Sequence, residues 1–369
     1  MKIKNVTVFI LMVLLGAKLF AADFINNVEK LVGYNAKSYA MPLVEGFGSS
    51  MNSGLYKKAS VDPGKLIPIG FDIGIANFYA FVPDDKMDFA HQLEDFQFNY
   101  TLMSGNQQIA EIPISFKDIY TTDKDRTPNI AGSEKGVKCT LKSDDEIFQT
   151  ISERLQSAGV NQAIIDANES AIKAYINESL NNEYSSFTFP KGLGISAMTA
   201  LALQANVRLP FIGLEVTGRY LPPMQFSADL GEINLLGVGL RKSVPVPILD
   251  VTVGAFVQQL KIGEFFTMDA RMLHAEVGKS IGIPFLFSLS PYAGIGYAQT
   301  KAELDYTIPA GTIPGFNIDQ KLKYTIKPDD QFVVTVGATA QIIPLTYLNL
   351  ELNQSDYLTA CIKLGVILK

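Results

Sequence analysis

The sequence has no tryptophan, two cysteines, two histidines and few charged residues. Charged residues make up 18% of its 369 positions, whereas apolar residues reach 47%. Soluble globular domains usually contain about 25% charged residues, and disordered chains are far less apolar than this one. Cys139 and Cys361 lie far apart, and no nearby Cys or His completes a zinc-type cluster, so we expect no metal and no other cofactor. The formal charge of -6 leaves no basic excess for phosphates, which argues against nucleic acid as a partner.

Long apolar runs are missing after residue 22, which excludes a further membrane-spanning helix in that part of the sequence. The first residues differ. Lys2 and Lys4 precede an apolar stretch at 6–15, and Leu19-Phe20-Ala21 fits a small-residue cleavage site. This pattern predicts a bacterial secretory signal peptide over residues 1–21. The alternative is an uncleaved anchor helix, which needs about 20 apolar residues.

The sequence instead alternates apolar residues with polar or small ones. The pattern is clear at 249–258, 285–297, 332–342 and 358–368. Because successive β side chains project to opposite faces, each stretch has one apolar and one polar or small face. Many stretches reach the ~9–11 residues of a tilted membrane strand, whereas ordinary strands average ~5–6. The pattern predicts an all-β fold, a transmembrane up-and-down antiparallel β-barrel with its apolar face outward. The alternative is a secreted or periplasmic β-sandwich.

The number of strands depends on which stretches enter the barrel. With both ends of the barrel on the periplasmic side, residues 66–369 give about 12 strands, including 96–103 and 110–116. Residues 22–65 are then an N-terminal segment, either a hatch inside the lumen or a first strand. Counting 46–55 and 320–326 as strands raises the number to about 14.

One insertion breaks the alternation. We expect it at 118–194, with two short helices in a helical hairpin over about 144–183 that begin at the N-caps Asp144 and Asn161. The stretch 144–183 has eight acidic and two basic residues. An acidic hairpin in solvent, outside the membrane, is the simplest interpretation, and a plug in the lumen is the alternative.

Several charged residues fall in the polar phase and are therefore expected to face the lumen. Because both signs occur, they can pair across the lumen, line a path for water, or contact a substrate. These candidates are Asp72, Arg208, Glu215, Arg219, Arg241, Asp250, Glu351 and Lys363.

A nucleophile–histidine pair would have to use one of two histidines. His91 lies in a polar stretch and His274 in a strand, and no recognisable hydrolase motif surrounds either. We therefore do not expect an enzyme.

Eight motifs resemble a large uncharacterised family of bacterial outer-membrane proteins. They occupy residues 41–48, 52–56, 70–72, 81–85, 127–132, 217–223 (Thr-Gly-Arg-Tyr-Leu-Pro-Pro), 236–242 and 291–297. More distantly, the layout is similar to FadL-type transporters of hydrophobic compounds, which are outer-membrane barrels with an N-terminal hatch. The Asn-Pro-Ala sequence of that hatch is absent here, since Lys57-Lys58-Ala59 follows Tyr56.

Together these observations predict a channel or passive transporter for small solutes, hydrophobic ones included, in the outer membrane of a Gram-negative-type bacterium. The alternative is a structural or surface-interaction barrel with a closed lumen. The expected partners are outer-membrane lipid, a hydrophobic small molecule and the outer-membrane assembly machinery.

Overall fold

The computed structural model describes residues 33–61, 69–95, 97–104, 107–177, 185–227, 231–283, 287–308, 320–343 and 345–368. The predicted signal peptide, residues 1–21, lies outside the described residues. Among the described residues, no helix is both long and apolar enough to cross a bilayer.

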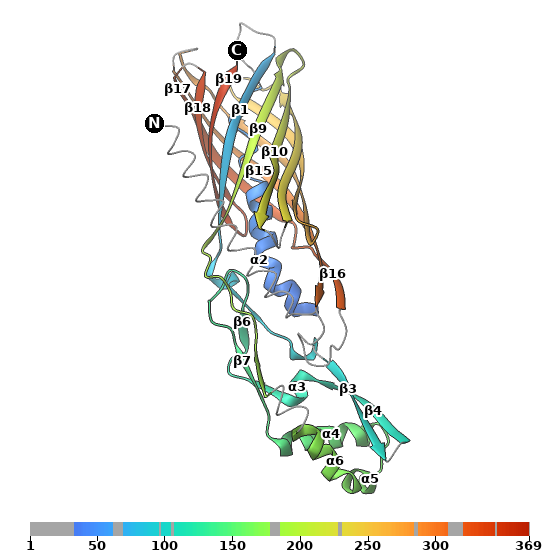
Figure 1. Cartoon of the computed structure of the whole chain (residues 1–369). Coiled ribbons are helices and arrows are strands. Elements are labelled where there is room, and N and C mark those ends of the chain that lie inside the picture. Colours follow the sequence, from blue (N-terminus) through green and yellow to red (C-terminus); the bar gives the residue numbers. More distant parts are fainter. Residues whose placement is uncertain are drawn as a thin grey trace.

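The described strands form a closed antiparallel barrel (Figure 1). Around the barrel, each strand pairs with its neighbours in the sequence, and β19 pairs back with β1 to close the ring. Ten strands go around: β1 (Gly70–Phe81), β9 (Ala197–Leu209), β10 (Leu214–Ser227), β11 (Gly231–Val244), β12 (Asp250–Ile262), β13 (Phe266–Gly278), β15 (Phe287–Ile308), β17 (Gln331–Ile343), β18 (Thr346–Gln354) and β19 (Leu358–Leu368). Two short strands, β14 (Ile281–Ile283) and β16 (Gln320–Ile326), pair with the two ends of the long β15.

The alternation seen in the sequence sets which residues face out. On β17, Phe332, Val334 and Val336 are 62%, 46% and 51% exposed, whereas Val333 and Thr335 between them are buried. The exterior of the other barrel strands is likewise apolar, as at Leu364 on β19. An apolar outer surface with a polar interior is the arrangement of a membrane-spanning barrel.

Three stretches that the sequence places in the barrel are elsewhere. Residues 96–103 and 110–116 correspond to β3 (Gln97–Ser104) and β4 (Gln107–Ser115), which form a separate hairpin outside the barrel. Their alternation has another cause: one face packs on protein, as Tyr100 does on the Tyr175 ring 5.0 Å away. Residues 46–55 are not a strand either, because Gly46–Met51 is the end of helix α2 (Gly33–Met51) and 52–55 form a turn. The ring therefore has ten strands, and β14 and β16, the latter the stretch 320–326 of the alternative count, bring the whole sheet to the expected 12.

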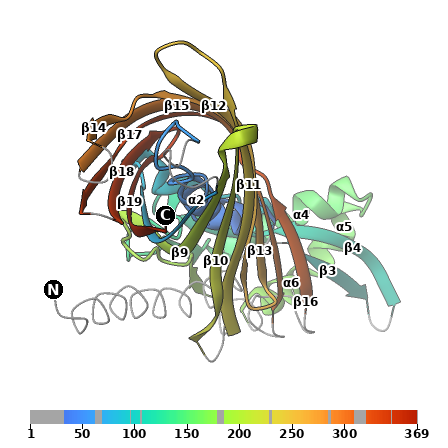
Figure 2. The ribbon, with the colours of Figure 1, turned by 90° about the horizontal axis from the view of Figure 1, so that it is seen from above.

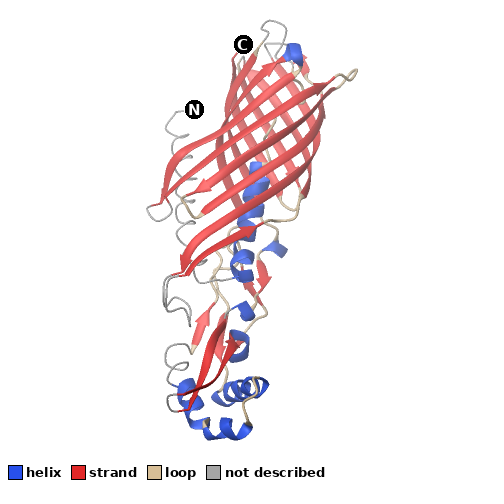
Figure 3. Ribbon diagram, turned by 90° about the vertical axis from the view of Figure 1, so that its right-hand side faces the viewer, coloured by secondary structure: helices blue, strands red, loops and turns tan. Residues whose placement is uncertain are grey.

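The insertion is larger than expected. The chain leaves the barrel after Phe81 and returns at Ala197, so the insertion covers residues 82–196 rather than 118–194. Figures 1 and 3 show it projecting from one end of the barrel, here called the insertion end. The opposite end carries tight connections such as η4 (Pro210–Ile212) and is called the turn end.

Small sheets and short helices make up the insertion. Its helices α4 (Asp144–Ser157), α5 (Gln162–Ala167) and α6 (Glu169–Tyr175) fall within the predicted helical region, and residues 178–184 lie outside the described residues. Asn161 is the N-cap of α5, as expected, but α4 is capped by Ser143 rather than Asp144. The remaining elements are η1 (Asp84–Lys86), β2 (Asp88–Ala90), η2 (Leu93–Asp95), α3 (Phe116–Ile119), β5 (Tyr120–Thr122), β6 (Arg126–Pro128), β7 (Lys138–Leu141) and β8 (Ser186–Thr188).

Candidate functional site: the plugged lumen

The lumen contains the chain segment that precedes β1. We call residues 33–61 the plug; it consists of α2 and an extended segment, 52–61. Figure 2 shows α2 inside the ring of strands when the barrel is viewed along its length. Met51 at the end of α2, and Leu55 and Tyr56 of the extended segment, are buried and bound by side chains of the barrel wall. The plug therefore occupies space that an open pore would leave to water.

The insertion holds the outer part of α2. The side-chain amide of Asn35 donates to the carbonyl of Gln92 at 2.6 Å, and the Gln92 N–H donates back at 2.9 Å. Lys86, in η1, pairs with Glu45 of α2 at 2.9 Å and with Asp356 of a barrel loop at 3.1 Å. The plug is thus tied to the insertion as well as to the barrel wall.

Arg219 on β10 binds the turn that follows α2. Its guanidinium donates to the carbonyl oxygens of Met51 at 2.6 Å, Ser53 at 2.9 Å and Gly54 at 3.0 Å. The guanidinium also lies over the rings of Phe78 and Phe256, at 4.6 and 5.5 Å from their centres. A planar guanidinium can donate several bonds and stack on aromatic faces at once, so Arg suits this position better than Lys.

Other strands bind the next residues through the main chain of the plug. Because the partners come from β9, β11, β17, β18 and β19, the extended segment lies near the axis of the barrel. Gln204 donates to the Leu55 carbonyl (3.1 Å), Lys363 to that of Tyr56 (2.8 Å), Thr339 to that of Lys57, and Arg241 to that of Lys58 (2.7 Å), while Glu351 accepts from the Gly54 N–H (2.6 Å).

Lys57 of the plug joins a buried ionic cluster. Its ammonium lies 2.8 Å from the carboxylate of Asp72 on β1, which also pairs with Arg208 at 2.9 Å. Asn206 donates to the same carboxylate at 2.7 Å. The three charged side chains are at most 3% exposed. One carboxylate between two cations gives this cluster a formal charge of one positive.

A second buried cluster surrounds Tyr56. Arg241 pairs with Glu215 and with Glu276, both at 2.9 Å. His274 Nδ1 lies 3.2 Å from Glu276, and the His274 ring is 4.1 Å from the ring of Tyr56. This cluster has two carboxylates around one guanidinium, the reverse of the first cluster, so the two nearly compensate in charge.

Small residues on the lumen face make room for these large side chains. A β-carbon on Gly74 or Gly365 would lie 2.8 or 2.6 Å from the hydroxyl of Tyr347. Tyr347 donates to Asp72 at 3.2 Å, and Tyr292 donates to Glu351 at 2.7 Å. These tyrosines point inward, so they do not belong to an aromatic belt at the membrane interface.

The structure brings together most of the residues singled out in the sequence. Asp250 is the exception, since it is only half-buried and lies at the turn end beside a cavity. The other candidates are all buried in the lumen and bind the plug or one another: Asp72, Arg208, Glu215, Arg219, Arg241, Glu351 and Lys363.

Some members of the site escaped the sequence argument. Glu276 and Gln258 lie in the polar phase of β13 and β12, so the same alternation could have identified them. Lys57 could not be found this way, because it is outside any strand. His91 lies in the insertion, its ring 4.9 Å from that of Phe189, far along the fold from His274. Among the described residues, no group of three or more His, Cys, Asp or Glu could hold a metal ion.

Comparisons with known proteins match the chain to one family. The model of a family of unknown function, DUF6588, matches residues 1–367. Among curated proteins, none matches the sequence. Similar solved structures include the β domain of the Bordetella autotransporter BrkA, at 8% identity over 81% of this chain and 99% of its own, with a TM-score of 0.27. The outer-membrane protease OmpT from Escherichia coli is 9% identical over 84% of this chain and 99% of its own, with a TM-score of 0.26.

A variant of the Vibrio cholerae outer-membrane protein OmpT, which lacks loop L8, is 8% identical over 82% of this chain and 100% of its own, with a TM-score of 0.23. At these identities and TM-scores the likeness says nothing about activity. These structures also add nothing to the FadL-type resemblance of the sequence.

Proposed function

The chain belongs to DUF6588, a family of unknown function, and we propose that it is a gated passive transporter of small, largely apolar solutes across the outer membrane. The plug is the gate. The observation that carries this proposal is that the barrel binds residues 51–58 through hydrogen bonds to their main chain, donated by side chains of the lumen.

Hydrogen bonds of this kind suit a segment that moves. Water can replace each of them, so a typical intramolecular hydrogen bond contributes only about 0.5–1.5 kcal/mol net. When the segment shifts, polar side chains such as Arg219 and Gln204 are left facing a lumen that water can enter. Small barrels without a guest fill their interior with their own side chains. Here Gly74 and Gly365 leave space that Tyr347 uses, and Gly278 leaves space for Ala59 of the plug.

The insertion supports a second candidate function, a surface-interaction barrel with a permanently closed lumen. Residues 82–196 have their own buried side chains, including Ile114, Ile147 and Leu155, and project beyond the barrel (Figure 3). A permanently closed barrel would need the plug only for stability. Movement of the plug therefore separates the two candidates.

A disulfide lock tests the gate. A β-carbon built on Gly54 would lie 3.3 Å from the Cβ of Cys361, slightly nearer than the ~3.5–4.5 Å of disulfides, so a small outward shift allows the bond. Gly54→Cys therefore places a second thiol beside a native one. The φ of Gly54 is +61°, so the substitution costs about 1–2 kcal/mol, and the Phe78 ring must shift slightly.

The readout is the uptake of N-phenyl-1-naphthylamine, an apolar fluorescent probe, by cells that express the chain. We expect Gly54→Cys cells to take up the probe when reduced, to lose the uptake after oxidation, and to regain it with dithiothreitol. Gly54→Cys with Cys361→Ser is the matched control, because it cannot form the bond and should ignore the oxidant. Wild-type uptake no higher than that of cells without the protein would overturn the transporter and favour the closed barrel.

A further inference from the structure

The chain segments at the turn end share a sequence pattern. Each of the four that join two ring strands there, and the segment directly before β1, contains a proline among large apolar residues. Connections at the insertion end instead carry charged residues, such as Glu264, Asp329 and Asp356. Turns in water are usually rich in Gly, Asn, Asp and Ser, so apolar turns at one end only need an explanation. The five runs are Leu66-Ile67-Pro68-Ile69, Leu209-Pro210-Phe211-Ile212, Val244-Pro245-Val246-Pro247-Ile248-Leu249, Ile283-Pro284-Phe285-Leu286 and Ile343-Pro344-Leu345.

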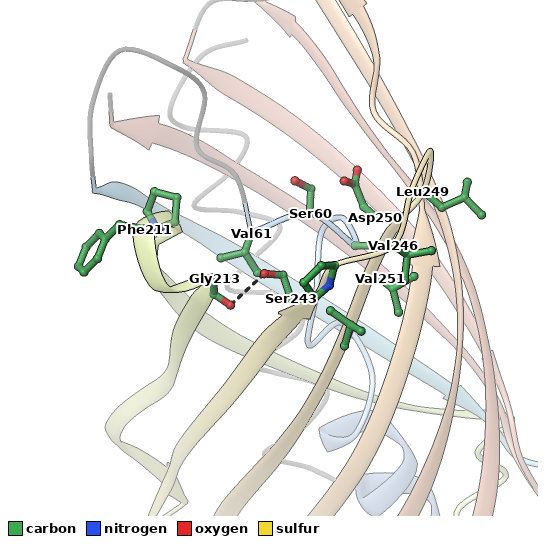
Figure 4. A pocket seen from close by; sticks show the side chains of 13 residues that line it. Ser60, Val61, Phe211, Gly213, Ser243, Val246, Leu249, Asp250 and Val251 are labelled. Carbon is green, nitrogen blue, oxygen red and sulfur yellow. Dashed lines mark hydrogen bonds between the residues drawn. The ribbon is translucent and has the colours of Figure 1, made fainter.

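Large side chains of these segments are exposed. Phe211 is 71% exposed and Ile248 82%. Figure 4 shows that Phe211 and Leu249 point away from the cavity between their turns. Each segment contributes one exposed residue to a set that we call the apolar rim: Ile69, Phe211, Ile248, Ile281 and Leu345.

Two residues of the apolar rim have a strained backbone. The φ angles of Ile248 and Leu345 are +75° and +76°, in the left-handed region. This region is unfavourable for residues with a β-carbon, and most of all for a β-branched one such as Ile. Gly or Asn would adopt it at lower cost. Strained residues persist where a function needs them, so the large apolar side chains at these tips have a use that the fold alone does not supply.

Proline suits a turn in apolar surroundings. It has no backbone N–H, and an N–H without an acceptor is costly in lipid because no water is present to bind it. The apolar rim also continues the outer wall of the barrel, where Val216, Val253 and Val277 near the same end are exposed. The apolar surface therefore extends from the wall to the tips of the turns.

Two lysines lie beside the apolar rim. Lys242 donates to the carbonyl of Ile212, and Lys279 donates to that of Ile248. Both side chains are exposed, so their apolar stems follow the wall while their amines reach the tips of the turns. An ammonium has three N–H groups, which leaves two on each lysine for a phosphate oxygen. Amines among apolar side chains are typical of surfaces that contact lipid headgroups.

We propose that the apolar rim is a lipid-binding surface that fixes the depth of the barrel in the membrane. The tips of the turns lie at the boundary between acyl chains and headgroups, where lipid and water meet. Belts of Trp and Tyr usually occupy this level, but the chain has no Trp, and Tyr292 and Tyr347 point into the lumen. Lipid fits the rim better than a protein partner does, because the rim is continuous with the lipid-facing wall and all five segments contribute to it.

A single tryptophan can report on the surroundings of the apolar rim. Because the chain has no Trp, Ile248→Trp introduces one reporter there. The full-length variant is reconstituted in phosphatidylcholine vesicles with or without lipids brominated on the acyl chain near the headgroup, which quench tryptophan on contact. We expect the brominated lipid to lower the emission at least twofold. Leu236→Trp on the outer wall should also be quenched, whereas Asp329→Trp, in an exposed proline turn at the insertion end, should keep its emission.

A second variant tests the role of the apolar side chains in anchoring. Phe211→Asn with Ile248→Asn makes two tips polar, and Asn tolerates the left-handed backbone at 248. We expect this variant to fold in detergent micelles as the wild type does, but to insert from urea into vesicles at least threefold more slowly, as measured by heat-modifiable gel migration. Met103→Asn with Ile164→Asn is the matched control, since it removes exposed apolar side chains from the insertion and should leave the rate unchanged.

Three results would overturn the inference. Quenching of the reporter at 248 by acrylamide but not by brominated lipid would place the rim in water. Protection from both quenchers would mean that a protein, or a second copy of the chain, covers the rim. Insertion of the double Asn variant at the wild-type rate would refute anchoring. The uptake experiment is independent of these results, because a barrel can be anchored in this way whether its lumen opens or not.

Discussion

The guanidinium of Arg219 lies 2.6 Å from the carbonyl oxygen of Met51, the residue at which α2 ends. The same group reaches the carbonyls of Ser53 and Gly54, so one side chain fixes the turn between the two parts of the plug. A lysine could not donate to all three in this planar arrangement.

We therefore expect Arg219→Lys to loosen residues 52–58 while the barrel remains closed. Buried carbonyls that lose a partner cost about 1–3 kcal/mol each, so the free energy of local opening should fall by about 2–3 kcal/mol. Hydrogen exchange measured by mass spectrometry should then show faster exchange in 52–58 and unchanged exchange in β10. Arg271→Lys, at an exposed position on β13, is the control. Unchanged exchange in the plug would show that Arg219 does not hold it.

The cluster around Asp72 makes a prediction about stability. Asp72→Asn removes the one carboxylate between Lys57 and Arg208 and leaves two buried cations together. Breaking a buried ion pair from one side typically costs about 3–5 kcal/mol. We expect a loss of this size in the free energy of unfolding, measured in urea in detergent micelles by heat-modifiable gel migration.

A double-mutant cycle isolates the contribution of the plug. Lys57→Met together with Asp72→Asn should cost less than the sum of the two single substitutions, because the double variant has one unpaired cation fewer. Strict additivity would mean that Lys57 and Asp72 do not interact.

The first turn of α4 depends on its N-cap. Ser143 Oγ accepts from the Glu146 N–H, and the Glu146 carboxylate accepts from the Ser143 N–H at 3.0 Å, which forms a capping box. Ser143→Ala should destabilise α4 by about 1 kcal/mol. Hydrogen exchange in residues 145–148 reports this change. Ser157→Ala, in the last turn of the same helix, should leave those amides unaffected.

Acid should loosen the contact between α3 and α4 through Asp118. Burial tends to raise the pKa of this carboxyl group, but hydrogen bonds from Arg154 and Ser115 outweigh burial and hold the pKa below its ordinary value. Asp118 therefore adds stability that is complete above the unfolded-state pKa of about 4 and is lost as the pH falls through the lower folded-state pKa.

Exchange of α4 amides should accordingly rise between about pH 5 and 3, after correction for intrinsic rates. Asp118→Asn should remove much of this dependence, whereas Asp145→Asn, at a carboxylate that is 91% exposed, should not. A wild-type profile identical to that of Asp118→Asn would refute the role of this group.

Labelling of introduced cysteines tests the orientation of the barrel. Both native cysteines are buried, and burial, followed by the nearby Asp123, raises the pKa of the Cys139 thiol to about 12, so background labelling should be low. In intact cells, a membrane-impermeant maleimide should label Gln156→Cys in the insertion. It should label Phe211→Cys at the turn end only after the outer membrane is permeabilised. The reverse pattern would place the insertion in the periplasm.

Alternation in the sequence predicts the barrel and the lumen-facing charges, because a two-residue period separates a wall exposed to lipid from a polar interior. It cannot say what covers an apolar face. Tyr100 and Leu102 alternate like barrel residues, yet both are buried in the insertion, where Tyr100 packs on Tyr175 of α6. For this reason the sequence assigned β3 and β4 to the ring, whereas they form a separate hairpin.

The plug was harder to predict in detail. The barrel binds the plug through its main chain, at carbonyls such as those of Tyr56 and Lys58. Because every residue has a backbone carbonyl, such contacts leave no signal in the sequence. The sequence predicted that residues 22–65 form either a hatch or a first strand. The structure shows a helix followed by an extended segment. The cavity beside Asp250 also depends on turns whose packing leaves no periodic signal.

The pairing of β1 with β19 has a consequence for biogenesis. The plug directly precedes β1, the first strand of the barrel, and the barrel closes only when β19, the last strand, pairs with β1. Unless these residues enter a barrel that has already closed, they must lie inside it before β1 pairs with β19. A chain truncated ahead of β1 should therefore close into a barrel with a water-filled lumen.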